Sequence, residues 1–262
     1  MEENIGMKTG MYDYHVHTDF SDGKNTLDEM LEAAKQAGLE AVAITDHFDP
    51  NDPRPSISDL KTELLLEQFA QIRQLSGHGG LRLLRGIETT PLPDGRLDIP
   101  EDVMAGLDIV ITSCHYIPYE GEMIPGEIFC DPYWQRFQEI LLNMAAGEGT
   151  VLGHSEEYLP IQPLLQGVKT TFEQRREICR SIADRYMGRP FIEKLTENLL
   201  KSGKACELHC ATSSPRGWVI EYMARRGVRF SPGSDAHGAA YIGKVEFAFQ
   251  MAERYGLTLL HL

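Results

Sequence analysis

Near the start of the sequence, two histidines separated by one residue form a pattern that could bind a metal ion. His15 and His17 lie in the stretch "YDYHVHTDFSDG", and Asp22 with Gly23 closes it. Residues i and i+2 of a strand point to the same side, so one short strand can present two imidazoles to a single metal ion. Alone the pattern is weak, because histidines at this spacing also occur as packing or surface residues.

Residues of the same kind recur at the ends of later apolar runs. They are Asp46 with His47, Glu88, His115, His154, Glu207 with His209, and Asp235 with His237. The ends of parallel strands open onto one face of a barrel, so seven of the nine histidines are predicted to converge there with Asp22, Glu88 and Asp235. His78 and His261 show no such placement and are assigned to the surface or to packing.

Each residue taken singly has an ordinary explanation. Asp46 could cap a turn, Asp22 and Gly23 form a common turn pair, and His115 or His154 could be a hydrogen-bonded core residue. These explanations would have to hold together at consecutive strand ends, which favours one shared site. Imidazole and carboxylate ligands without thiolates suit Zn, Mn or Fe.

The elements that would position these residues are repeated βα units. Apolar runs alternate with amphipathic stretches, which indicates an α/β protein of about seven units. The expected strands are Met11 to His15, Ala41 to Thr45, Leu81 to Ile87, Asp108 to Ser113, Thr150 to Gly153, Lys204 to Leu208 and Val228 to Ser231. The expected later helices are Ile57 to Ser76, Tyr133 to Gly147, Thr171 to Met187, Pro190 to Ser202, Arg216 to Arg226 and Ile242 to Tyr255.

The first helix carries the clearest local signals. Thr26 followed by Glu29 predicts a capping box, and Gly38 predicts the stop. The segments Asp49 to Ser56 and Pro91 to Pro100 are expected to be loops that rim a pocket at the carboxyl ends of the strands.

Composition bounds the class of protein. The chain has 262 residues, of which 42% are hydrophobic, and no linker divides it, so we expect one domain over residues 1–262. It has no apolar run of membrane-spanning length, and its start lacks the apolar stretch of a signal peptide, so we expect a cytoplasmic protein without a membrane partner. The five cysteines form no CxxC pair, which favours reduced thiols.

The net charge restricts the partners. At −14 the surface repels polyanions, so binding to long nucleic acid is not expected. A small phosphorylated substrate stays compatible, because buried carboxylates around divalent cations are neutralised locally. The sequence leaves the oligomeric state open.

The motifs together resemble the PHP (polymerase and histidinol phosphatase) superfamily, particularly its histidinol-phosphatase-like branch. The matching stretches are "HVHTDFSDG" from His15, "TDH" at 45–47, "GIE" at 86–88, "SCH" at 113–115, "GH" at 153–154 and "GSDAH" at 233–237. They cover nearly the whole chain in the expected order. The resemblance implies a distorted TIM-like barrel of seven βα units.

The resemblance also implies a trinuclear metal site. His15, His17, Glu88 and Asp235 would hold one ion, Glu88 with His115 and His154 the second, and Asp22 with His47 and His237 the third. Asp46 would be a partner that orients a ligand histidine.

The expected chemistry is hydrolysis of a small phosphate monoester by a metal-activated hydroxide. Histidinol phosphate is the leading substrate hypothesis. The alternatives are a phosphodiesterase or exonuclease that acts on nucleotides or 3',5'-bisphosphates, and a non-catalytic metal-binding or regulatory module. Asp46, His237 and Arg216 are the candidate catalytic residues; either Asp46 or a water on the third ion would protonate the leaving group.

Two departures from the family pattern fall near the expected pocket. The fifth-strand motif reads "GHSEE", with Ser155 after the histidine and the acids Glu156 and Glu157 beyond it, where histidinol-phosphatase relatives typically read "GHID" or "GHLD". His209 stands where relatives tend to have asparagine. His209 is therefore a candidate contact to substrate or metal. Arg216 is a candidate phosphate fork, with a solvated residue at a helix start as the equal alternative.

Overall fold

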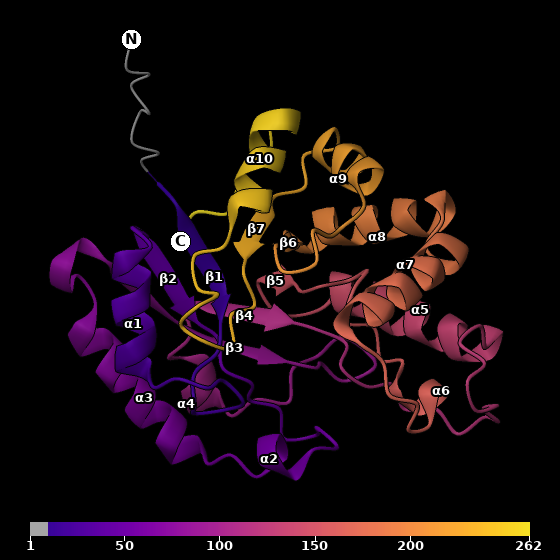
Figure 1. Ribbon diagram of the computed structural model, residues 1–262, viewed down its shortest axis with the longest axis horizontal. Coiled ribbons are helices and arrows are strands. Elements are labelled where there is room, and N and C mark those ends of the chain that lie inside the picture. Colours follow the sequence, from indigo (N-terminus) through magenta and orange to yellow (C-terminus); the bar gives the residue numbers. More distant parts are fainter. Residues whose placement is uncertain (1–9) are drawn as a thin grey trace.

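Seven parallel strands in chain order form the framework of the protein (Figure 1). The structure is a computed structural model that describes residues 10–262. Every strand pairs in parallel with the next along the chain. The strands are β1 (Tyr12–Val16), β2 (Ala41–Ile44), β3 (Arg82–Thr89), β4 (Ile109–Thr112), β5 (Val151–Leu152), β6 (Ala205–His209) and β7 (Phe230–Gly233).

Helices follow the strands and cover the sheet. Figure 1 shows α1 and α3 on one flank, α5, α7 and α8 on the opposite flank, and α9 with α10 near β6 and β7. Among the described residues no helix combines the length and the apolar character needed to cross a membrane. The helices are α1 (Leu27–Gln36), α2 (Pro55–Ser58), α3 (Thr62–Leu75), the 3₁₀ turn η1 (His78–Gly80), α4 (Glu101–Met104), α5 (Asp131–Ala146), α6 (Gln162–Leu165), α7 (Phe172–Tyr186), α8 (Arg189–Ser202), α9 (Gly217–Ala224) and α10 (Glu246–Tyr255).

The sheet curls into a nearly closed barrel because β1 meets the segment that follows β7. Val16 forms a parallel bridge with Ala236, and His17 N donates to Ala236 O at 3.0 Å. The fully buried Asp13 adds a side-chain clamp across the same seam. Its carboxylate accepts hydrogen bonds from the backbone N–H groups of Ser234 and Gly243, each at 2.9 Å. The seam therefore fixes the first histidine pair beside the last acidic motif.

Apolar side chains fill both the barrel and the layers outside it. Tyr12 and Tyr14 pack with residues of the other strands, while the outer layer on one flank includes Trp134 and Phe137 of α5. Met30 of α1 lies in the core of the opposite flank. All five cysteines are unpaired.

The predicted α/β barrel of seven units is confirmed. Each predicted strand overlaps an observed strand, and the helix signals at α1 hold: Thr26 and Glu29 form the capping box, and Gly38 follows the helix with a φ of 70°. Bounds differ by a few residues, as is usual where helix and strand ends fray.

Two predicted helices differ from the observed ones. The helix expected from Ile57 to Ser76 is two helices, α2 and α3, separated by Asp59–Lys61, and no glycine or proline in that gap signals the break. The helix expected from Ile242 begins only at Glu246, because Gly243 adopts a φ of 76°, which is outside the helical region. The short helices α4 and α6 show no strong helical spacing of apolar residues, and they were not predicted from the sequence.

Replacing Asp13 with Ala tests the seam. The N–H groups of Ser234 and Gly243 would lose their buried acceptor, so the free energy of unfolding should fall by about 2–6 kcal/mol, at about 1–3 kcal/mol per unsatisfied group. Urea unfolding followed by circular dichroism measures the loss. The exposed Asp28→Ala control should change stability by less than about 0.5 kcal/mol. Equal stability of the two variants would show that Asp13 does not hold the barrel closed.

Candidate metal centre

The nine residues predicted to bind metal come together at the carboxyl ends of the strands. His15 is in β1, Glu88 is in β3, and the others directly follow strands or lie in the loops beyond them. Five are buried and the others lie toward the open side, with side-chain exposures between 10% and 35%. The buried members are His15, His17, His47, Glu88 and His154.

Glu88 lies at the middle of this cluster. Its Oε1 is 2.9 Å from His154 Nε2 and 3.3 Å from His115 Nε2. Its Oε2 is 3.1 Å from His47 Nδ1, and His15 and His17 approach the same oxygen within 3.5 Å. Burial alone would raise the pKa of Glu88, but the surrounding imidazoles hold that pKa well below its usual range. The two oxygens of one carboxylate thus face two different sets of histidines.

Asp235 faces the histidine pair of β1 from the other side of the barrel seam. Its Oδ1 lies 3.2 Å from His17 Nε2 and 3.5 Å from His15 Nε2. The backbone of Asp235 has a φ of 54°, in the left-handed region that non-glycine residues seldom adopt. Such strain is common where function fixes a side chain. The carboxylate could therefore share an ion with both histidines and Glu88.

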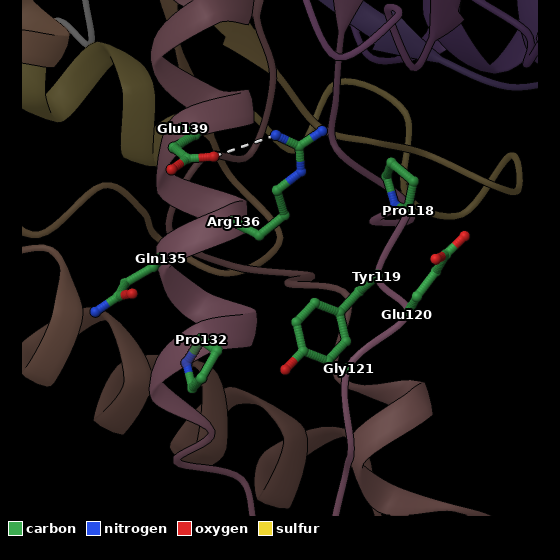
Figure 2. A pocket seen from close by; sticks show the side chains of 8 residues that line it. All are labelled: Pro118, Tyr119, Glu120, Gly121, Pro132, Gln135, Arg136 and Glu139. Carbon is green, nitrogen blue, oxygen red and sulfur yellow. Dashed lines mark hydrogen bonds and ion pairs between the residues drawn. The ribbon is translucent and has the colours of Figure 1, made fainter.

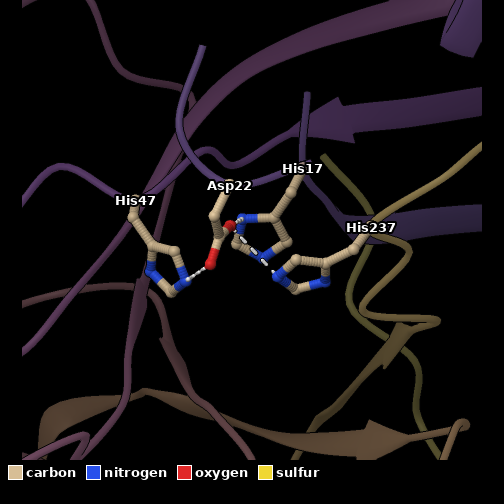
Figure 3. Close-up of side chains that lie close together, drawn as sticks. All are labelled: His17, Asp22, His47 and His237. Atoms are coloured by element: carbon tan, nitrogen blue, oxygen red, sulfur yellow. Dashed lines mark ion pairs between the residues drawn. The ribbon is translucent and has the colours of Figure 1, made fainter. Parts of the chain in front are cut away.

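A third group lies at the open edge of the cluster (Figure 3). Asp22 Oδ1 is 3.1 Å from His237 Nε2, and Asp22 Oδ2 is 3.4 Å from His47 Nε2. Figure 3 shows the carboxylate of Asp22 between these two rings, with His17 beside it. Burial would lower the pKa of His237, but hydrogen bonding to Asp22 and the charge of Asp235 raise it to about 9.

The donor atoms of the cluster fit divalent metal ions. His15 Nε2 and both ring nitrogens of His17 are buried and find no hydrogen-bond partner within residues 10–262, a costly state for polar atoms unless something binds them. Three groups have ligand atoms within 4.8 Å of one another: His17, Asp22, His47 and His237; His15, His17 and Glu88; and His47, Glu88 and His115. Imidazole and carboxylate without thiolate are suitable for Zn, Mn or Fe.

These groups overlap more than the predicted assignment to three ions. His17 belongs to two groups, as do His47 and Glu88. Glu88 is shared as the resemblance implies, whereas His17 and His47 were each assigned to a single ion. The geometry therefore brings the predicted donors together, and the division of His17 and His47 among ions stays a prediction.

Glu207, in β6, supports the cluster from behind and was not among the predicted site residues. Its Oε1 lies 2.6 Å from His15 Nδ1, and its Oε2 accepts a hydrogen bond from the backbone N of His154 at 2.6 Å. A carboxylate on one imidazole nitrogen leaves the other nitrogen free for a metal. The signal in the sequence was an acid inside an otherwise apolar strand, "ACELH".

His209 contacts the metal cluster through Asp235. Its ring is fully buried, with Nε2 3.1 Å from Asp235 Oδ2 and Nδ1 2.7 Å from Thr212 Oγ1. Both ring nitrogens are thus engaged by protein groups. These bonds place His209 as a support for the carboxylate of Asp235, and its contact with substrate or metal stays a prediction.

Asp46 is fully buried, and its side chain binds the loop that leads to Asp22. Its carboxylate accepts hydrogen bonds from Thr18 N, Thr18 Oγ1, Ser21 Oγ and Gln68 Nε2, at 2.6 to 2.9 Å. Among the described residues no histidine donates to it, in contrast with the prediction that it orients a ligand histidine. It positions Asp22 by holding Thr18 and Ser21.

Arg216 lies at the start of α9, where it forms a network of ion pairs. Its guanidinium donates to Glu156, to Asp184 and to the carbonyl of Met187. Its nearest charged partners are Glu156 Oε1 and Asp184 Oδ1, both at 2.7 Å, and neither is a predicted ligand. The proposed phosphate fork is therefore occupied by carboxylates, which favours a structural role.

Figure 2 shows an open surface hollow that none of the cluster residues lines. It has a volume of about 640 Å³ and lies between the segment Pro118–Gly121 and α5. Arg136 and Glu139 form an ion pair at its wall, 3.1 Å apart. None of the nine predicted ligands lines it, so this hollow is separate from the candidate metal centre.

Relatives of this chain carry phosphatase and polymerase names. One is the DNA polymerase/3'-5' exonuclease PolX of Bacillus subtilis, 39% identical over 104 residues, which are 39% of this chain and only 18% of that protein's length. Another is a probable phosphatase of Thermoanaerobacter sp. strain X514, 26% identical over 94% of this chain and 86% of that protein.

Solved structures share the fold. The histidinol phosphate phosphatase of Lactococcus lactis, crystallised with zinc, L-histidinol and phosphate, superposes with a TM-score of 0.67 at 18% identity, covering 95% of each chain. The model of one family, described as the PHP domain, matches residues 13–196, which include seven of the nine predicted ligands. Because that match spans more than half of the sequence, the chain belongs to the PHP domain family.

Proposed function

We propose that this protein is a metal-dependent phosphoesterase that hydrolyses a small phosphate monoester at a site for three divalent ions. The observation that carries the proposal is the sharing of Glu88: one buried carboxylate faces two sets of histidines, and a third set gathers on Asp22 beside them. A carboxylate placed in this way would hold two neighbouring divalent ions, which would supply Lewis acidity for displacement at phosphorus.

Short distances between donor atoms support the ligand sets that the family resemblance implies. His15, His17, Glu88 and Asp235 lie within 3.5 Å across their facing donor pairs, as one ion requires. Glu88 with His115 and His154 would hold the second ion. Asp22 with His47 and His237 would hold the third.

Bound divalent ions supply Lewis acidity and lower the pKa of water so that it can attack phosphorus at neutral pH. The chain's own residues prepare the site for them. Glu207 keeps the outer nitrogen of His15 engaged, so that Nε2 points into the cluster. Asp46 holds the Thr18–Ser21 turn and thereby sets the position of Asp22. His237, with a side chain 35% exposed, lies at the edge through which a substrate reaches the cluster.

Histidinol phosphate is the leading substrate hypothesis. Its support is the likeness in fold and length to the histidinol phosphate phosphatase of Lactococcus lactis, which covers 95% of both chains. The alternative is hydrolysis of nucleotides or 3',5'-bisphosphates, which the 39% identity to part of PolX favours. The net charge of −14 opposes long nucleic acids but not these small substrates. A non-catalytic module has less support, since every predicted ligand position holds a competent donor.

Phosphate release tests the substrate directly. Protein purified without chelator and supplied with Mn or Zn should hydrolyse histidinol phosphate with kcat/KM above about 10⁴ M⁻¹ s⁻¹, an ordinary efficiency for an enzyme acting on its own substrate. The comparison is a nucleoside 3',5'-bisphosphate under the same conditions. A preference for the bisphosphate would move the protein to the alternative substrate class, and no turnover of either would count against the phosphoesterase.

Replacing Asp235 with Ala should reduce turnover to background and lower the metal content. The substitution removes the carboxylate oxygen that faces both His15 and His17. Elemental analysis of the dialysed protein and a phosphate-release assay measure the two effects, with Asp28→Ala as the surface control. A full metal content in the Asp235 variant would contradict the proposed ligand set.

Replacing Glu207 with Gln should weaken metal binding by ~10- to 100-fold, the usual effect of removing a carboxylate behind a ligand histidine. The measurement is a metal titration of the apoprotein with Mn or Zn. Glu156→Gln is the matched control, because Glu156 is as buried but pairs with Arg216 rather than with a predicted ligand. Equal metal affinities in the two variants would show that Glu207 does not support metal binding.

A further inference from the structure

The loop between β2 and α2 brings one arginine to the edge of the metal cluster. Arg54 Nη1 lies 3.9 Å from Asp22 Oδ2, a predicted ligand of the third ion. Among residues 10–262, no other arginine or lysine places a charged nitrogen within 4.0 Å of Asp22, Glu88 or Asp235. The positive charge nearest to the site therefore comes from a residue that sequence reasoning did not select.

A buried carboxylate holds Arg54 in this direction. Asp52 accepts hydrogen bonds from Arg54 N at 2.7 Å, Nε at 2.9 Å and Nη2 at 2.8 Å. The side chain of Asp52 is 1% exposed, whereas that of Arg54 is 46% exposed. One edge of the guanidinium is thus fixed to the protein, while the side chain stays partly open to solvent.

The turn that carries the pair is itself tied to the framework. Asp52 N donates to Asp49 O at 3.2 Å, and the side chain of Asp49 accepts from the N–H groups of Asn51 and Thr90. Thr90 directly follows β3, the strand that carries Glu88. The position of Arg54 is thereby linked to that of the central carboxylate.

The end of the guanidinium that lies toward the cluster keeps N–H donors that are free to bind a ligand. Within residues 10–262, Nη1 of Arg54 makes no hydrogen bond and lies only in ion-pair range of Asp22. In Arg216, by contrast, all three side-chain nitrogens donate hydrogen bonds: Nε to Glu156, Nη1 to Asp184 and Nη2 to the carbonyl of Met187. Once cations neutralise the carboxylates of the cluster, a free guanidinium end is suited to the oxygens of a phosphoryl group.

We propose that Arg54, oriented by Asp52, binds a phosphoryl oxygen of the substrate beside the ion held by Asp22, His47 and His237. The assignment rests on the proposed phosphoesterase function and adds to it a substrate-binding residue. It gives to Arg54 the role that the sequence suggested for Arg216.

The test compares variants of the metal-loaded protein in two assays. Calorimetric titration with inorganic phosphate gives Kd, and hydrolysis of histidinol phosphate and of p-nitrophenyl phosphate gives kcat and KM separately. Arg54→Ala should weaken phosphate binding and lower kcat/KM by ~10- to 100-fold, as expected for losing a charge-assisted hydrogen bond. Metal content should stay at the wild-type level.

Three further variants separate the alternatives. Arg54→Lys keeps the charge without the fork and should lose less than Arg54→Ala. Asp52→Asn weakens the clamp and should lie between wild type and Arg54→Ala. Arg96→Ala is the matched control, because Asp94 and Arg96 form the same i, i+2 ion pair at 2.8 Å on an exposed loop, and its Kd and kcat/KM should stay within about 2-fold of wild type.

Each adverse outcome has one meaning. A phosphate Kd for Arg54→Ala within about 2-fold of wild type would overturn the assignment. Loss of metal in that variant would also overturn it, since Arg54 would then act by holding Asp22. If wild type binds phosphate through Arg54 but hydrolyses neither ester, the proposed function fails while the binding role of Arg54 stands.

Discussion

The burial of Glu88 among five imidazoles is the constraint on which the rest of the site depends. A carboxylate 1% exposed must be compensated, and here each of its oxygens faces a different set of histidines. Three ring nitrogens of His15 and His17 that face this carboxylate and Asp235, or lie beside them, have no hydrogen-bond partner in the part of the chain that the structure describes. Cations bound between them would satisfy both sides at once, which is why a metal centre explains the cluster better than packing does.

The barrel makes this concentration of polar groups tolerable by surrounding it with fixed partners. Glu207 engages His15, His209 engages Asp235, and Asp46 gathers the donors of the turn before Asp22. None of these supporting residues needs to touch a substrate. They limit the rotamers of the ligand side chains. The side chains are therefore already ordered in the folded protein, and metal binding loses less conformational entropy.

The fold was largely predictable because its signals are local. The seven apolar runs, the capping box at Thr26 and the glycine after α1 all depend on neighbours in the sequence. The errors arose where tertiary contacts decide. The break between α2 and α3 has no glycine or proline to mark it, and the late start of α10 depends on the backbone of Gly243, whose N–H binds Asp13 on β1.

The sequence by itself determined which donors converge, because parallel strands end on one face and every strand end carries a histidine or an acid. Only the tertiary structure decided what the remaining polar residues do. Arg216 and Arg54 are both arginines at helix starts, yet Glu156 and Asp184 occupy the first, while Asp52 turns the second toward Asp22. The partners of a long charged side chain come from distant segments, and no local pattern encodes them.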